Sequence, residues 1–249
     1  IAASNNHSQK LVSKLYNSIL NFKVFQASSI ETAEAVKILE NSQRDLNIAM
    51  INEYNEVFRK SKLNTMEIIN LASSKWNFYK VFPGLVGGQC IPIDPYYALK
   101  YAKDFKSQLS LTKLGRETNE NIKNKVQNKI LKIAKERKKI LFIGVAYKKN
   151  TFDYKYSKIY EIMKFINKRK FQINFFDTKI KKILINKKFI FSKKLNEIKK
   201  FNNIILGNAL NGAQINNILK KVNKNSNIIN LSSKIIKNKN YKIKLEPFA

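Results

Sequence analysis

One thiol and one unusual loop carry most of the chemistry that this sequence could support. Cys90 is the only cysteine, and it lies in the segment FPGLVGGQCIPIDP. The chain has only 7 glycines and 4 prolines, yet six of these residues gather around the thiol: Pro83, Gly84, Gly87, Gly88, Pro92 and Pro95. Glycine allows a close backbone approach to a ligand and proline restricts the chain, so the segment is typical of a preformed cradle that presents a thiol.

A purely structural explanation of this loop competes with the chemical one. Cysteine is also a small apolar residue, and Cys90 could be a buried core residue in an ordinary Gly-Pro turn. Asp94 and Pro95 are residue types preferred at the N-cap and first turn of a helix, so we expect a helix to begin near Tyr96.

The elements that must position the loop follow from residue periodicity. Ser28 with Glu31 three residues later fits a capping box, and no Gly or Pro interrupts the chain up to Lys60. We therefore expect one helix of about 30 residues over Glu31–Lys60. Along it runs a rough stripe at helical spacing: Ala33, Val36, Leu39 or Glu40, Gln43, Leu46, Ala49 and Met50. Further expected elements are helices over Leu11–Leu20, Thr65–Ser73 and about Leu111–Lys135, and a strand-like patch over Phe22–Ala27.

From Lys139 onward, the sequence alternates between strand and helix patterns. The expected strands are KKILFIGVAY, FQINFFD (which ends at Asp177), KKFIFS, NNIIL and SNIINL, and the amphipathic helix is YSKIYEIMKFINKRK. This alternation predicts an α/β fold with a doubly wound parallel sheet. We expect three units: residues 1–29, a central helical domain over 30–118 that contains the long helix, and a Rossmann-like doubly wound parallel-sheet domain over 119–249.

The composition excludes some classes of protein and leaves the role of the charge open. With 44% hydrophobic residues, the chain is too apolar to be disordered. The net charge of +31 suggests a polyanionic partner. The lysines are, however, spread along the whole chain together with Asn and Ile, which is typical of an AT-rich coding sequence rather than of a binding stripe. We expect no specific nucleic-acid partner, and a basic, non-specific nucleic-acid-binding protein stays as an alternative.

The sequence also bears on membrane-spanning segments, metal sites and the cellular compartment. No apolar run is long enough to cross a bilayer, and the N-terminus lacks the layout of a signal peptide. A lone cysteine fits a reducing compartment, so we expect a cytoplasmic protein. The single histidine, His7, lies near the N-terminus. This position argues against a His-based metal site and against a Ser-His or Cys-His pair.

Several motifs, in order along the chain, resemble one enzyme family. PGLVGGQCIPIDPYY resembles the catalytic loop of the UDP-glucose/GDP-mannose dehydrogenase family, and KWNFYKVFPGLVGGQC is similar to the branch that oxidises UDP-N-acetylhexosamines. AEAVKILENSQRDLNIAMINE is similar to the family's central helix, and LGRETNENI and ILFIGVAYKKNTFD follow in the family's order. The resemblance covers residues 1–180 well and 181–249 loosely. It implies NAD as cofactor, a UDP-N-acetylhexosamine as substrate and a homodimer formed through the long helix.

The resemblance also implies roles for individual residues. In the family, the C6 hydroxyl of the sugar is oxidised to a carboxylate with two NAD, and a cysteine carries the second oxidation through a thiohemiacetal and a thioester. Cys90 matches this nucleophile. Lys37 and Asn41, on one helix face, match the residues over the reacting carbon, and Asp94 matches an acid that positions the hydrolytic water. The residues expected to bind the nucleotide sugar are Tyr79, Gly84, Gly87, Gly88, Arg116, Tyr147 and Lys148, and Lys155 is expected to contact the cofactor.

Structural roles compete with several of these assignments. A Lys–Asn pair in a chain rich in both residues is, without its context, a solvated helix face. Arg116 could be a helix-surface charge and Tyr79 a core residue. Asp94 could serve as a helix cap in addition to, or instead of, a role in hydrolysis.

The chain also departs from the family pattern. The family begins with a Rossmann domain that carries a Gly-rich dinucleotide turn, and the first thirty residues here contain no such turn. Residues 1–29 resemble only the end of that domain, so we expect a fragment without the NAD-binding portion. Gln89 and Lys155 stand where histidine and arginine are usual, and lysine lacks the planar fork of arginine. A catalytically inactive UDP-sugar-binding remnant is therefore an alternative to an enzyme completed by a longer chain or a second subunit.

Overall fold

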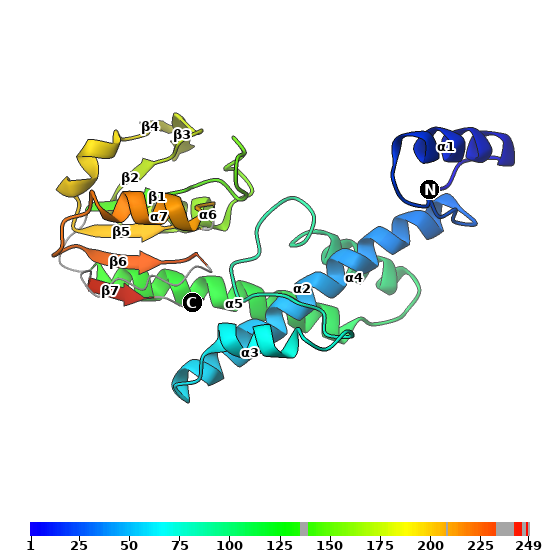
Figure 1. The fold of residues 1–249 in the computed structure, drawn as a ribbon, viewed down its shortest axis with the longest axis horizontal. Helices are drawn as coiled ribbons and strands as arrows, with labels where there is room; N and C mark the ends of the chain where they lie inside the picture. Colours follow the sequence, from blue (N-terminus) through cyan, green and yellow to red (C-terminus); the bar gives the residue numbers. More distant parts are fainter. Residues whose placement is uncertain (135–138, 208, 233–241, 246–247, 249) are drawn as a thin grey trace.

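The molecule is elongated, with a sheet unit at one end, crossing helices in the middle and a small helical segment at the far end (Figure 1). The computed structural model describes residues 1–134, 139–207, 209–232, 242–245 and 248. The helices outside the sheet unit are α1 (Asn6–Ile19), α2 (Ile30–Lys60), α3 (Thr65–Ala72), α4 (Asp94–Asp104) and α5 (Ser110–Ile133). Helix α5 runs from the crossing with α2 into the sheet unit (Figure 1).

The expected helices are confirmed, with corrections at their ends. Ser29, not Ser28, caps α2, because its Oγ accepts the Thr32 N–H at 3.1 Å. The expected end of the α5 helix at Lys135 lies outside the described residues. The strand expected over Phe22–Ala27 is wrong: this segment is not a strand. It is held instead by the chain's first residue, since the ammonium of Ile1 donates to Phe25 O at 2.7 Å and Ala27 N–H donates to Ile1 O at 2.8 Å.

Helix α2 buries a polar face, not the apolar stripe that the sequence showed. Val36 and Leu39 are 51% and 70% exposed. The buried residues of α2 are Asn41, Ser42, Asp45, Ala49, Ile51, Asn52 and Asn55. Buried polar groups need hydrogen-bond partners. The middle of the molecule is therefore organised by a polar network. A small apolar cluster around Ile51 and Ile69 and a buried hydrogen bond from Thr65 Oγ1 to Asn55 Oδ1 at 2.8 Å join α2 to α3.

The sheet unit confirms the expected doubly wound parallel fold. Its five-stranded sheet has the order β2-β1-β5-β6-β7, and every neighbouring pair is parallel. Its strands are β1 (Lys139–Ile143), β2 (Gln172–Phe176), β5 (Asn203–Leu206), β6 (Asn227–Asn230) and β7 (Lys242–Leu245), accompanied by α6 (Lys158–Lys168), the 3-10 helix η1 (Leu195–Lys200) and α7 (Gly212–Leu219). KKFIFS supplies β4 (Lys188–Phe191), which pairs antiparallel with β3 (Lys182–Ile185) and lies outside the five-stranded sheet.

Alternate residues of β1 enter two separate cores. Ile140 and Phe142 pack with apolar residues of α5 and α6, whereas Leu141 and Ile143 pack with those of η1 and α7. All four are fully buried, as expected for a central strand of a parallel sheet covered on both faces. None of the helices in the described part of the chain is long and apolar enough to span a membrane.

Where β1 and β5 end, their two backbones approach each other closely. A Cβ on Gly207 would lie 2.2 Å from the carbonyl oxygen of Gly144, so only glycine fits at this position. Adjacent strands at which the strand order reverses form the switch point of a doubly wound sheet, and ligands bind such sheets outside the carboxyl ends of the strands. The loop that follows β1 at this edge, residues 144–157, reaches the Cys90 segment.

Candidate active site

Cys90 lies at the surface, in the loop that leads into α4. Its side chain is exposed, which contradicts the alternative of a buried core cysteine. Its carbonyl oxygen accepts hydrogen bonds from Ile93 N–H at 2.9 Å and Asp94 N–H at 2.8 Å. The thiol is therefore presented by a tight turn immediately before a helix.

Asn41 and Asp94 meet at the base of this turn. Asn41 is 2% exposed, and its Nδ2 donates to Asp94 Oδ2 at 2.6 Å. Helix α4 begins at Asp94, its N-cap residue is Ile93, and no side chain caps it. The expectation that Asp94 caps the helix is therefore wrong. Its carboxylate is instead bonded to α2, beside the turn that carries the thiol.

Lys37 lies one turn before Asn41 on α2 but is held differently. Its Nζ lies 3.2 Å from Glu40 Oε2, and both side chains are largely exposed. Such a surface pair contributes little to stability. The structure thus places Lys37 on the expected helix, with its ammonium group paired at the surface.

Tyr79 is not a core residue, because its side chain is exposed. Its hydroxyl accepts a hydrogen bond from Arg44 Nε at 3.2 Å. Arg44 follows Asn41 by three residues on α2, and our reading of the sequence missed it. The only signal available was this spacing, which puts the two residues on neighbouring positions of one face.

The beginning of the Cys90 loop is held by one buried asparagine of α2. Asn52 Nδ2 donates to Gly84 O at 3.0 Å, and Gly84 N–H donates to Asn52 Oδ1 at 2.8 Å. The side-chain amide thus pairs with the backbone as a neighbouring strand would. A Cβ on Gly84 would meet nothing within 4 Å, so the protein itself gives no steric reason for glycine here.

The middle of the loop packs against the loop that follows β1. Gly88 has φ +105°, a conformation that favours glycine, and its N–H donates to Tyr156 O at 2.9 Å. A Cβ on Gly87 would approach Tyr156 O to 3.2 Å, and a Cβ on Gly88 would lie 3.5 Å from the ring of Tyr147. Close packing therefore explains Gly87 and the positive φ explains Gly88, and these contacts bring the loop that carries Tyr147 against the loop that carries Cys90.

Lys148 and Lys155 lie on the same loop after β1, and both are exposed. Lys148 lines a cavity of about 150 Å³ at the carboxyl ends of β1 and β2, together with Gly144 and Asp177. Within the described ranges, no group of three His, Cys, Asp or Glu side chains could hold a metal ion.

Comparison with known proteins identifies the architecture of this site. Residues 31–121, which include α2, the Cys90 loop and the start of α5, match the model of the UDP-glucose/GDP-mannose dehydrogenase family, central domain. The chain belongs to the UDP-glucose/GDP-mannose dehydrogenase family. Its similarity to individual members extends well beyond the central domain.

Two curated members illustrate the similarity in sequence. UDP-N-acetyl-D-glucosamine 6-dehydrogenase of Salmonella typhi is 34% identical over 174 residues, which make up 68% of this chain and 41% of that protein. UDP-N-acetyl-D-mannosamine dehydrogenase of Methanocaldococcus jannaschii is 32% identical over 173 residues, 68% of this chain and 39% of that protein. The chain thus spans about two fifths of the length of these relatives.

Solved structures show the same fold. UDP-D-ManNAc dehydrogenase of Pyrococcus horikoshii matches with a TM-score of 0.75 at 24% identity, over 94% of this chain and 55% of that one. UDP-glucose dehydrogenase of Pyrobaculum islandicum matches with a TM-score of 0.77 at 15% identity, over 99% of this chain and 57% of that one. The helical middle and the parallel sheet unit are therefore a known arrangement of this dehydrogenase family.

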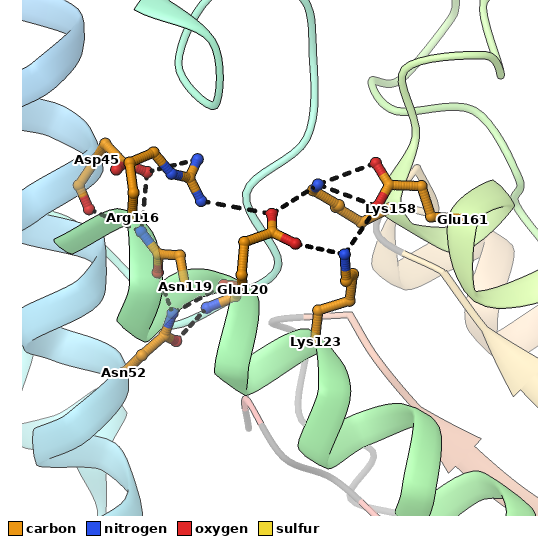
Figure 2. A network of polar contacts seen from close by, with 9 residues as sticks. Asp45, Asn52, Arg116, Asn119, Glu120, Lys123, Lys158 and Glu161 are labelled. Carbon is orange, nitrogen blue, oxygen red and sulfur yellow. Dashed lines mark hydrogen bonds and ion pairs between the residues drawn. The ribbon is translucent and has the colours of Figure 1, made fainter. Parts of the chain in front are cut away.

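Arg116 of this family member lies inside the protein, which contradicts the alternative of a helix-surface charge. It is 1% exposed, and its guanidinium lies 3.2 Å from Asp45 and 3.6 Å from Glu120 (Figure 2). Asp45 also accepts a hydrogen bond from Asn119 Nδ2 at 2.8 Å, and Asn119 in turn accepts one from Asn52 Nδ2 at 3.1 Å. The network around Arg116 therefore continues to the asparagine that holds the Cys90 loop.

Glu120 connects this network to the sheet unit. Lys158, at the start of α6, lies 2.9 Å from Glu120, and Lys123 forms an ion pair with the other carboxylate oxygen (Figure 2). Both lysines also bind Glu161. Residues of α2, α5 and α6 are thus joined by alternating charges, and one end of this chain of contacts lies beside the packing site of Gly87.

The ion pairs shift the pKa values of the network. Desolvation acts to raise the pKa of Glu120, but the hydrogen bonds and charges of Lys123 and Lys158 outweigh it and lower that pKa below its ordinary 4.5. Desolvation likewise opposes the shift at Lys123, but the two glutamates raise its pKa above 10.5. Stability from Glu120 is present above pH 4.5 and is lost as the pH falls through its lowered pKa. Stability from Lys123 is present below pH 10.5 and is lost as the pH rises through its raised pKa.

We expect Glu120→Gln to flatten the acid side of the stability profile. The free energy of unfolding of the wild type should fall more steeply than that of the variant as the pH drops below 4.5. Urea denaturation over a pH series measures this difference. Glu117→Gln is the matched control, because Glu117 is an exposed residue of the same helix. Equal acid slopes in the wild type and Glu120→Gln would contradict the role assigned to the Glu120 carboxylate.

Proposed function

We propose that the chain is the central and C-terminal part of an NAD-dependent UDP-N-acetylhexosamine 6-dehydrogenase, which oxidises the C6 hydroxyl to a carboxylate. The relatives named above support this substrate class, since they are dehydrogenases of UDP-N-acetylglucosamine and UDP-N-acetylmannosamine. The observation that carries the proposal is the exposed thiol of Cys90 on a turn whose base holds the Asn41–Asp94 pair. A nucleophile beside a buried amide and a carboxylate can both form and hydrolyse a thioester.

In the proposed mechanism, the Cys90 thiolate adds to the aldehyde formed by the first oxidation and gives a thiohemiacetal. Loss of hydride from this adduct gives a thioester, and water then cleaves it to release the carboxylate. The Asn41 amide and the Lys37 ammonium stabilise the oxygen at the reacting carbon, and Asp94 positions the hydrolytic water. Lys37 must exchange its contact with Glu40 for the substrate, which costs little at an exposed pair.

The proposed nucleotide-sugar site lies between the Cys90 loop and the loop after β1. Tyr79, Gly84, Gly87 and Gly88 contribute from the first loop, and Tyr147 and Lys148 from the second. Arg116 is 1% exposed and forms ion pairs with Asp45 and Glu120, while its three guanidinium nitrogens make no hydrogen bond to the described residues. We therefore assign the first contacts of the diphosphate to the exposed Lys148 rather than to the buried Arg116.

We place the NAD outside the described sheet unit. The turn after β1 is the position where such a fold would hold a dinucleotide. Gly144 is the single glycine of this turn, whereas a dinucleotide turn carries several, and a Cβ on Gly144 would lie 2.8 Å from Leu210 Cγ, so Leu210 packs directly against the turn. Lys155 would then contact a cofactor held by another part of the enzyme. NAD held there would supply the hydride acceptor for both oxidation steps, and we propose that a longer chain or a second subunit supplies its binding portion.

The homodimer in this proposal forms through α2. Several apolar side chains of this helix are exposed: Val36, Leu39, Met50, Tyr54 and Val57. A second copy would cover them, as apolar faces of this kind usually mark protein contacts. We also propose that the dimer is cytoplasmic, where a lone exposed thiol such as Cys90 stays reduced.

Binding of UDP-N-acetylglucosamine to the chain tests the proposal without the cofactor. We expect isothermal titration calorimetry to give a Kd between about 1 µM and 1 mM, the range of ordinary substrate affinities. Lys148→Gln should weaken this binding about tenfold, because a charge-assisted hydrogen bond to phosphate is lost. Lys149→Gln, at the neighbouring exposed position, is the matched control and should bind like the wild type.

Two other outcomes would contradict the enzyme proposal. Binding of UDP-sugar without any NAD reduction, even after an NAD-binding portion is supplied, would identify the chain as an inactive binding remnant. RNA binding that survives moderate salt, with no binding of UDP-sugar, would favour a nucleic-acid-binding protein, since purely electrostatic binding weakens steeply as salt rises.

A further inference from the structure

The Cys90 loop is tied to the loop after β1 by one pair of side chains. Gln89, the residue before Cys90, donates from Nε2 to Asp153 Oδ2 at 3.3 Å. The two residues are 64 positions apart in the sequence. Beside this bond, Gly88 N–H donates to Tyr156 O at 2.9 Å. Two hydrogen bonds thus join the glycine-rich part of the thiol loop to the sheet unit.

Asp153 also orders the loop on which it lies. Its other carboxylate oxygen, Oδ1, accepts Lys155 N–H at 3.0 Å, and its carbonyl oxygen accepts Tyr147 N–H at 3.2 Å. Its own N–H donates to Thr151 Oγ1 at 3.2 Å. One residue therefore bonds to both ends of its loop and to the neighbour of the thiol.

The Cys90 loop needs such an external restraint. Gly87 and Gly88 carry no side chain that could pack within the loop, and Gly88 adopts φ +105°. Glycines gain the most conformational freedom when a loop is released. The carbonyl oxygen of Cys90 is held from the C-terminal side by Ile93 and Asp94, and on the N-terminal, glycine side contacts from outside the loop must supply the restraint. Among the described side chains, Asp153 makes such a contact at the residue next to the thiol.

We propose that Asp153 is a positioning residue, which holds Cys90 in a fixed relation to the loop that carries Tyr147 and Lys148. A ligand bound to that loop then meets the thiol at a set distance, as catalysis by proximity requires. The significance for catalysis rests on the proposed function of Cys90. The restraint itself does not, because it is a property of the two loops alone.

A spin label on the single thiol tests the restraint without substrate or cofactor. With a nitroxide attached to Cys90, we expect Asp153→Ala to narrow the electron paramagnetic resonance spectrum, because the loop then moves faster on the nanosecond scale. Hydrogen exchange of the Gly88 amide should rise about tenfold in the unlabelled variant, since local opening exposes it more often. Gln89→Ala should have the same effect, and combining the two changes should add little more.

A conservative variant and a matched control separate positioning from general destabilisation. Asp153→Asn should restore the wild-type spectrum, because its amide oxygen can accept the Lys155 N–H and its amide group can pair with Gln89 once that side chain turns over. Asp104→Ala removes an exposed aspartate that contacts Lys100 on its own helix, and it should leave the spectrum unchanged.

An unchanged spectrum and unchanged Gly88 exchange in both Asp153→Ala and Gln89→Ala would overturn the proposal. If Asp153→Ala fails to fold, Gln89→Ala decides, because the Gln89 side chain is exposed. If the two variants change the spectrum as expected but the wild type does not bind UDP-sugar, the restraint stands and the proposed function fails. The two failures are therefore distinguishable.

Discussion

Replacing Cys90 with serine is expected to abolish formation of the sugar carboxylate while leaving nucleotide-sugar binding intact. The hydroxyl of serine is far less nucleophilic than a thiolate near neutral pH, so no thioester forms. We expect turnover to carboxylate to fall by at least about 10³-fold when the chain is joined to an NAD-binding portion. Product analysis measures this loss, and calorimetry measures the binding. Because Cys90 is exposed and its side chain supports no core contact, the free energy of unfolding should change little.

A control at a comparable surface position makes this result specific. Ser107→Ala changes an exposed residue beyond the end of α4 and should leave turnover unchanged. Carboxylate formation by Cys90→Ser at the wild-type rate would remove Cys90 from the mechanism. Such a result would leave the Asn41–Asp94 pair as a purely structural contact.

Replacing Arg116 with alanine is expected to give a loss of stability of about 3–5 kcal/mol, because it leaves a buried carboxylate without its partner. Asp45 is fully buried, and desolvation already raises its pKa above the ordinary 3.8 against the opposing charge of Arg116. Without that charge the pKa should rise further. A carboxyl group whose pKa is raised on folding costs stability at neutral pH, and the cost disappears as protonation sets in at lower pH.

Urea denaturation at two pH values tests the assignment of this loss. The deficit of Arg116→Ala should be larger at about pH 7 than at about pH 4, as the linkage argument requires. Asp45→Asn in the same background should recover part of the lost stability, because it removes the buried charge. Lys113→Ala, which breaks an exposed pair with Glu117 on the same helix, should cost less than about 1 kcal/mol. Equal deficits for Arg116→Ala at both pH values would contradict the ion-pair explanation.

Local patterns predicted most elements of the fold. The long α2 helix followed from the absence of Gly and Pro, and β1, β2, β5 and β6 followed from their short apolar runs, whereas β7 was not predicted. The patch at Phe22–Ala27 has the same apolar character but is not a strand. A strand exists only through its neighbours, and a short apolar run does not show whether a neighbour is present.

The buried face of α2 and the role of Asp94 depend on hydrogen-bond partners that are distant in the sequence, so the sequence did not predict them. The buried face of α2 is made of Asn41, Asp45 and Asn52, whose partners Asp94 and Asn119 lie far away in the sequence: Asn119 is 74 residues from Asp45. In a chain so rich in Asn and Lys, these residues gave no signal by type. Asp94 was predicted to be a helix cap because the neighbouring sequence gives no sign of its hydrogen bond to Asn41, which lies 53 residues away on α2. The glycine and proline cluster around Cys90 was detectable because both residue types are rare elsewhere.

Helix α5 belongs to both the helical middle and the sheet unit, so the molecule cannot be divided within it without disrupting both parts. Its first half packs against α2 and α4, whereas Val126 and Ile130 in its second half lie in the core of the sheet unit. The expected boundary between residues 118 and 119 falls inside this continuous helix. Both halves therefore share this helix, and a sharp kink between them would require backbone hydrogen bonds of α5 to break. A shorter expression product that ends within Ser110–Ile133 would therefore expose apolar side chains that α5 now covers.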